Sequence, residues 1–69
     1  MAMTQADVDT ARRAIYVAKQ TACEAWYTAV VNGDKPGRQT AKQTLSDLQD
    51  REDALANVES VIKQIANLP

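Results

Sequence analysis

The fold of this chain is decided by the stretch Asn32-Gly33-Asp34-Lys35-Pro36-Gly37-Arg38-Gln39, which holds both glycines and one of the two prolines of the 69 residues. Glycine after asparagine is typical of a left-handed helix end. Lys35-Pro36-Gly37-Arg38 fits a type II turn. A short β-hairpin within residues 28–40 is a weaker alternative, because its second arm lacks alternating apolar residues. We therefore expect a loop at residues 33–39 with a helix on each side.

The segment before this loop has the periodicity of an amphipathic helix. Its apolar residues recur at alternating steps of three and four: Val8, Ala11, Ile15, Ala18, Ala22, Ala25 and Ala29. Thr4 can cap the start of the helix, and Asp7 stands three residues further on. We expect a helix over residues 4–32. Because most of its apolar stripe is alanine, a second helix can approach it closely.

The segment after the loop has the same periodicity with larger side chains. Thr40-Ala41-Lys42-Gln43 fits a capping box, so a second helix is expected over residues 40–67. Its apolar stripe is Ala41, Leu45, Leu48, Leu55, Val58, Ile62 and Ile65. Large residues facing small ones interdigitate. The pattern predicts a single all-α domain over residues 1–69, an antiparallel two-helix hairpin.

Two charged residues, Arg51 and Glu52, interrupt the apolar stripe of the second helix. The spacing of Leu48 and Leu55 suggests that position 51 should be apolar. In one interpretation Arg51 extends outward and pairs with Asp47 on the same helix. In the other, Arg51 and Glu52 form a candidate ion pair between subunits, which would fix their register.

A chain this small needs support beyond its own core, since below about 70–80 residues one core seldom supplies more than about 3–5 kcal/mol. Cys23 is the only cysteine and histidine is absent. We therefore expect Cys23 to be a small core residue, with no disulfide and no base to activate it. The acidic residues at 47–53 lie within a helix and lack the spacing of a calcium loop. We predict no enzymatic activity, no cofactor and no metal site, and expect homo-oligomers or complexes with other proteins.

The second half of the first helix is apolar on more than one face. Trp26 and Tyr27 are adjacent and so point about 100° apart, and both cannot cover the second helix. Aromatic residues are among the commonest anchors of protein interfaces. We predict a protein interface at the loop-proximal end, formed by Trp26, Tyr27, Val30 and Val31.

The charge distribution does not favour nucleic-acid binding. The formal net charge is −1. Arg12, Arg13 and Lys19 are separated from Lys35 and Arg38 by most of a hairpin about 40 Å long, which makes a poor groove. No run of 18 apolar residues exists, so no membrane span is expected. A single unpaired thiol favours a cytosolic origin.

The order of these features resembles the small head-completion and head–tail connector proteins of tailed bacteriophages, the lambda W type and its helical relatives. The shared features are a capped alanine-rich helix, an aromatic pair, the Gly37-Arg38 step, Thr40, and a helix start Leu45-x-x-Leu48 that contains Asp47-Leu48. The chain departs from the W type in lacking a clear β-hairpin and a basic end. The resemblance implies a non-enzymatic ring subunit below the portal. Its partners would be portal and connector proteins, and its location the virion, assembled in the bacterial host cytoplasm.

Two functions of other classes fit the same pattern. One is a small regulator that binds nucleic acid as a dimeric four-helix bundle, for which salt-dependent RNA retention would be diagnostic. The other is an inhibitor of a host protein that acts through the Trp26–Tyr27 end. A monomer with one tight partner would favour that function.

Overall fold

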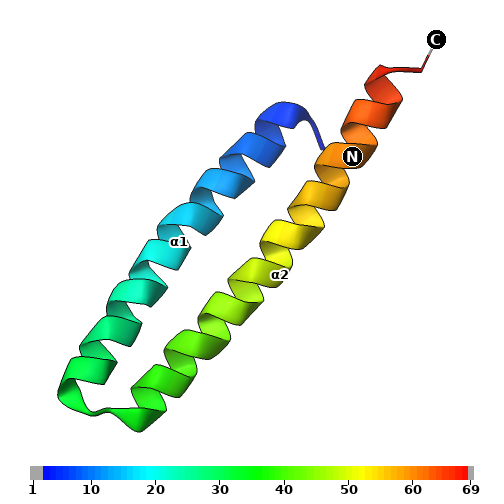
Figure 1. Cartoon of the computed structure of the whole chain (residues 1–69). Coiled ribbons are helices and arrows are strands. Elements are labelled where there is room, and N and C mark those ends of the chain that lie inside the picture. The colour runs from blue at the N-terminus through cyan, green and yellow to red at the C-terminus, as the bar shows by residue number, and fades with distance from the viewer. Residues whose placement is uncertain (1–2, 69) are drawn as a thin grey trace.

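In the computed structural model, which describes residues 3–68, the chain is two antiparallel helices joined by a tight turn (Figure 1). Helix α1 spans Gln5–Asn32 and helix α2 spans Lys35–Ala66. The molecule is a rod of 58 × 17 × 15 Å. The predicted all-α hairpin is confirmed, and residues 3–68 contain no strand. Within the same range no helix is apolar over a length that could cross a membrane.

Both ends of α1 form as the sequence predicts. The Thr4 hydroxyl accepts a hydrogen bond from the Asp7 backbone N–H, and the Asp7 carboxylate accepts one from the Thr4 N–H. This reciprocal capping satisfies donors that a helix start leaves free. At the other end Gly33 adopts φ 67°, in the left-handed region where glycine has no steric cost. Its N–H donates to the Val30 carbonyl, which closes the helix.

The predicted loop at residues 33–39 and the helix start at residue 40 are wrong. Helix α2 begins at Lys35, so only Gly33 and Asp34 separate the helices. Asp34 is the cap, because its side chain accepts from the Gly37 N–H at 3.1 Å. Pro36 lies in the first turn, where its missing N–H costs nothing. The Thr40 hydroxyl donates to the Pro36 carbonyl within the helix, so Thr40 caps nothing.

The core is a single row of side chains between the helices. The buried apolar residues are Val8, Ile15, Ala22 and Ala29 from α1 and Ala41, Leu48 and Leu55 from α2. Both sets recur every seven residues, the spacing of helices that supercoil around each other. Four of these seven residues are larger than alanine, and only Val8 is completely enclosed. The core is therefore thin, as expected for two helices with no third element.

Three residues predicted as core are exposed. Ala25 lies on the edge of the helix pair, and Cys23 faces outward one position beyond the buried Ala22. Ile65 is 62% exposed. Ile65 is exposed for two reasons: it lies on the same side of α2 as the exposed Thr44, and α2 continues past the level at which α1 begins (Figure 1). An apolar position has no partner where the opposite helix is absent.

One edge of the hairpin is held by charged side chains that the sequence analysis did not pair. Arg12 Nη1 lies 3.2 Å from Glu59 Oε2, and Lys19 Nζ lies 2.6 Å from Glu52 Oε2. Each pair joins α1 to α2. Because these side chains are partly exposed, solvent and salt screen both pairs, and each adds little to stability.

We expect the hairpin to lose stability in acid through Glu59. Hydrogen bonds from Arg12 and then from Gln5 lower the pKa of Glu59 below its ordinary value of 4.5. The stabilisation is therefore fully present above about pH 4.5, and is lost as the pH falls through the lower pKa of the folded state. Thermal melting followed by circular dichroism from about pH 7 to about pH 3 measures it. In Glu59→Gln this part of the acid destabilisation should be missing, and an unchanged pH profile in that variant would contradict the assignment.

Candidate interaction surfaces

The predicted interface residues lie on the outside of α1 next to the turn. Trp26 and Val30 are 40% and 39% exposed, and Tyr27 and Val31 are each 66% exposed. Within each of these two pairs the residues stand four apart, so they form two neighbouring rows on the helix surface. We call these four residues the loop-end surface. The hairpin does not use them in its core, and their role as an interface stays a prediction.

Trp26 and Tyr27 have different surroundings, as their angular separation predicts. Trp26 lines a hollow of about 250 Å³ whose other walls come from α2: Lys35, Arg38, Gln39 and Lys42. These α2 residues are spaced three and four apart, which brings them to one side of a helix. The sequence analysis assigned Lys35 and Arg38 to a loop, so it did not predict that they lie beside Trp26. It did not propose Lys42 as a site residue. The hollow gives the loop-end surface a positive rim beside a tryptophan ring.

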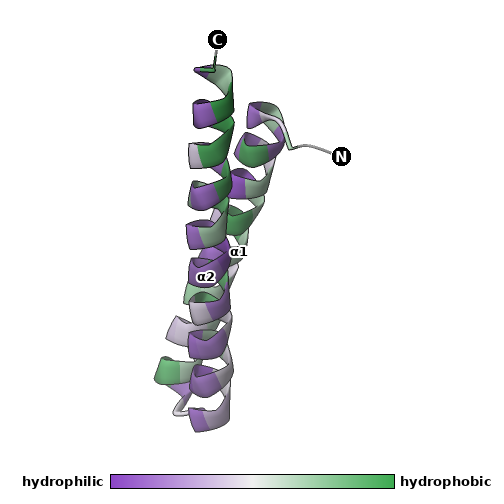
Figure 2. Cartoon of the chain, turned by 90° about the vertical axis from the view of Figure 1, so that its right-hand side faces the viewer, coloured by the Kyte–Doolittle hydropathy of each residue, from purple (hydrophilic) through white to green (hydrophobic). Residues whose placement is uncertain are grey.

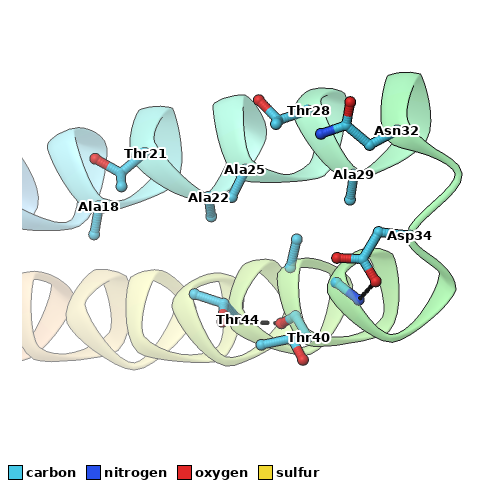
Figure 3. Close-up of a pocket in the computed structure, with 12 residues that line it drawn as sticks. Ala18, Thr21, Ala22, Ala25, Thr28, Ala29, Asn32, Asp34, Thr40 and Thr44 are labelled. Atoms are coloured by element: carbon cyan, nitrogen blue, oxygen red, sulfur yellow. Dashed lines mark hydrogen bonds between the residues drawn. The ribbon is translucent and has the colours of Figure 1, made fainter.

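A second surface is a shallow groove of about 810 Å³ between the helices, close to the turn. Its walls are small side chains, and those that matter here are Thr21, Ala25, Thr28, Gly37, Thr40 and Thr44. Figure 3 shows Ala18, Ala22, Ala25 and Ala29 pointing from α1 toward α2. Ala22 and Ala29 are buried at the floor of the groove, whereas Ala25 and the threonines of its walls are exposed and leave it open to solvent. We call this surface the Ala/Thr groove.

The threonines of the Ala/Thr groove are less polar than their type suggests. Thr21, Thr40 and Thr44 each donate the hydroxyl hydrogen to the carbonyl four residues earlier on their own helix, at 3.2, 3.0 and 3.0 Å. These three hydroxyls therefore need no acceptor from a partner. Apart from Asn32 and Asp34 at its turn end, the groove suits apolar contact, because alanine, glycine and threonine methyl groups dominate its walls.

A third surface lies at the opposite end of α2. Val58, Val61, Ile62 and Ile65 line an apolar hollow of about 330 Å³ together with Met3. Figure 2 shows the hydrophobic side of α2 concentrated toward its C-terminal end. Val61 is 52% exposed and Ile65 62% exposed. We call Val58, Val61, Ile62 and Ile65 the C-terminal aliphatic patch.

The candidate ion pair between subunits, Arg51 and Glu52, stays a prediction, and within one chain the two side chains have different surroundings. Glu52 is half-buried, with a side chain that is 43% exposed, and it is bound to Lys19 of the same chain at the edge of the helix pair. Arg51 is exposed, as the first interpretation expected. The ion pair expected with Asp47 does not form, because the Asp47 carboxylate accepts a hydrogen bond from Gln43 instead. Among residues 3–68 Arg51 has no salt-bridge partner.

The acidic side chains of α2 do not converge. Glu52 is bound to Lys19, and Asp53 accepts a hydrogen bond from Gln49 on its own helix. In the part of the chain that the structure describes, no group of three acidic, histidine or cysteine side chains is placed to hold a metal ion.

The chain matches no known protein family, no curated protein and no solved structure.

Proposed function

We propose that this chain is a non-enzymatic structural adaptor, a subunit of an oligomeric assembly. More narrowly, we propose a head-completion or head–tail connector subunit of a bacteriophage virion. The broader proposal rests on one observation: more large apolar side chains are exposed than are buried. Over residues 3–68 ten large hydrophobic side chains are exposed, whereas four are buried. Contiguous apolar surface of this kind marks sites of association.

The distribution of these residues supports an adaptor. The loop-end surface and the C-terminal aliphatic patch lie toward opposite ends of a rod 58 Å long. A rod with apolar surface at both ends can hold two neighbours at a fixed separation. Both surfaces are built on long helices, which keep their position better than loops do.

The bacteriophage proposal rests on the resemblance in sequence. It draws on the Gly37-Arg38 step, Thr40, and the helix segment that contains Asp47-Leu48. The two-residue turn of this chain leaves no room for the β-hairpin of the W type. The helical relatives in that group are therefore the better comparison.

The test is assembly with bacteriophage portal and connector proteins, chosen from genes that neighbour the gene of this chain if such genes are found there. Truncating an interface anchor often costs about 2 kcal/mol, or about 30-fold in affinity. We expect Trp26→Ala and Tyr27→Ala to prevent incorporation into the complex while leaving helical content unchanged, because both side chains lie outside the core. Co-purification and circular dichroism are measured on the same samples.

The matched control is Asp50→Ala combined with Asp53→Ala, two exposed residues on the outer side of α2. This variant should assemble like the wild type. Normal incorporation of both aromatic variants would place the docking surface elsewhere on the hairpin. Failure of the wild type to bind any portal or connector protein would reject the bacteriophage role.

A second candidate function, nucleic-acid binding, is favoured by the hollow beside Trp26. A base can stack on an exposed tryptophan while Lys35, Arg38 and Lys42 contact phosphates. Among the other cations, Arg12 and Lys19 are bound to acidic side chains and so are less available. Trp26 is the only tryptophan, so quenching of its fluorescence by single-stranded RNA, weakened by salt, would reveal this function.

A further inference from the structure

We propose that two copies of this chain pair antiparallel, with the C-terminal aliphatic patch of each copy seated in the Ala/Thr groove of the other. This inference rests on the proposed function in one respect, that the chain works as an assembly subunit. It adds the identity of one partner, a second copy, and the face through which that copy binds.

The groove and the patch lie on one face of α2. Gly37 and Thr44 of the groove stand at multiples of seven residues from Val58 and Ile65 of the patch. Thr40 and Val61 stand three multiples of seven apart. The buried residues of α2 keep the same seven-residue spacing, so positions related by seven face the same side along the whole supercoiled helix. A single flat contact can therefore engage both surfaces.

The two surfaces complement each other in size and polarity. The groove is lined mainly by alanine, threonine and glycine around about 810 Å³ of open space, with Asn32 and Asp34 at its turn end, and the patch carries valine and isoleucine side chains. Three groove threonines have their hydroxyl donors bound to their own backbone. Large apolar side chains entering a groove of small ones give close packing without leaving those hydroxyls unsatisfied.

Charge fixes the register of the pair. Asp47 and Arg51 lie on this face of α2, between the groove and the patch, at positions related by seven to Thr40 and to Thr44. In an antiparallel pair centred near residue 49, Arg51 of each copy meets Asp47 of the other. The same register sets Val58 opposite Thr40 and Val61 opposite Gly37. The charge match and the apolar match thus require the same alignment.

The antiparallel arrangement follows from the placement of the surfaces. The groove is close to the turn and the patch is at the far end of the rod. Two copies related by a two-fold axis can satisfy both grooves and both patches at once, and the contact closes with a dimer. A parallel pair would set patch against patch and leave both grooves empty.

The exposed area is sufficient for such a contact. The chain exposes 5429 Å². A compact monomer of 7.6 kDa is expected to expose about 4,300 Å², which leaves an excess of about 1,100 Å². A standard interface buries about 800 Å² on each partner. The excess therefore covers one dimer contact of ordinary size.

The first experiment is sedimentation equilibrium of the full chain over about 1 µM to 1 mM, the range in which weak dimers dissociate. We expect a monomer–dimer equilibrium. Val61→Glu should raise the dimer dissociation constant at least about 100-fold, because the lost contact occurs twice in a two-fold interface. The matched control is Val17→Glu, a valine of similar exposure on the outside of α1, at 54% against 52%. It should dimerise normally.

The second experiment exchanges the charges. Asp47→Arg and Arg51→Asp should each weaken the homodimer, because each variant sets like charges against each other. Mixing the two single variants should restore a dimer, now a heterodimer, and native mass spectrometry distinguishes it from either homodimer by mass. Circular dichroism of each variant checks that the helices are intact.

The pairing is overturned by a chain that stays monomeric at about 1 mM, by particles that grow beyond a dimer, or by equal losses in Val61→Glu and Val17→Glu. Absence of heterodimer in the mixture would remove the proposed register. These results are independent of the assembly test at Trp26, since that residue lies outside the shared face. Loss of pairing with intact portal binding would reject this inference alone.

Discussion

Leu55→Asp is expected to abolish the fold of the isolated hairpin. Leu55 is 7% exposed and lies in the centre of the core cluster with Ile15 and Leu48. Removing a buried leucine forfeits about 1.5–3 kcal/mol of burial, and an unpaired carboxylate in its place adds several more. The sum exceeds the roughly 3–5 kcal/mol that a core of this size supplies. Far-ultraviolet circular dichroism at neutral pH should show the loss of most helical signal.

The control is Arg51→Leu, four residues earlier on the same helix. Arg51 is exposed and has no ion-pair partner within residues 3–68. A leucine there should leave the helical content and the melting temperature of a dilute sample close to those of the wild type. If Leu55→Asp kept its helices, the core would lie elsewhere, and if Arg51→Leu lost them, Arg51 would have a structural role that its exposure does not reveal.

Ala22→Phe is expected to destabilise the hairpin by roughly 3 kcal/mol, the upper part of the usual cost of overpacking. Ala22 is 5% exposed and packs in the core with Leu48. Its small size lets the helices approach, and a phenyl ring at this point would push them apart along much of their length. Urea unfolding followed by circular dichroism measures the change in the free energy of unfolding.

Ala56→Phe provides the comparison for that measurement. Ala56 is exposed on α2, so the same enlargement there should change the free energy of unfolding by less than about 0.5 kcal/mol, as is usual for surface sites. Equal effects of the two substitutions would mean that the alanines of α1 do not set the distance between the helices.

Much of the fold follows from local chemistry and could be predicted. The Thr4 cap and the left-handed Gly33 depend on a few neighbouring atoms, and the structure confirms both. The turn was mispredicted because two local rules compete at Pro36. Proline followed by glycine suits a type II turn, yet proline in a first turn after an aspartate cap suits a helix. The Asp34 cap decides for the helix, since it adds a hydrogen bond to the Gly37 N–H.

The candidate surfaces could be predicted only in part. The exposed position of Trp26 and Tyr27 follows from their angular separation on one helix, which the sequence contains. The cations around Trp26 come from the other helix, and their position depends on where α2 begins. The bonds of Glu52 to Lys19 and of Glu59 to Arg12 depend on the register between the helices. No local sequence pattern specifies the register between the two helices.

By itself the sequence determined the two helices, their outer ends and the apolar stripes, because these depend on propensity, capping and a period of three to four residues. Tertiary structure alone decided which stripe residues are buried. Ile65 is apolar and belongs to the predicted stripe, yet it is 62% exposed, because it lies outside the buried seven-residue series of α2 and α1 does not reach its level. Burial needs a partner atom across the interface, and the relative length and register of the helices decide whether one is there.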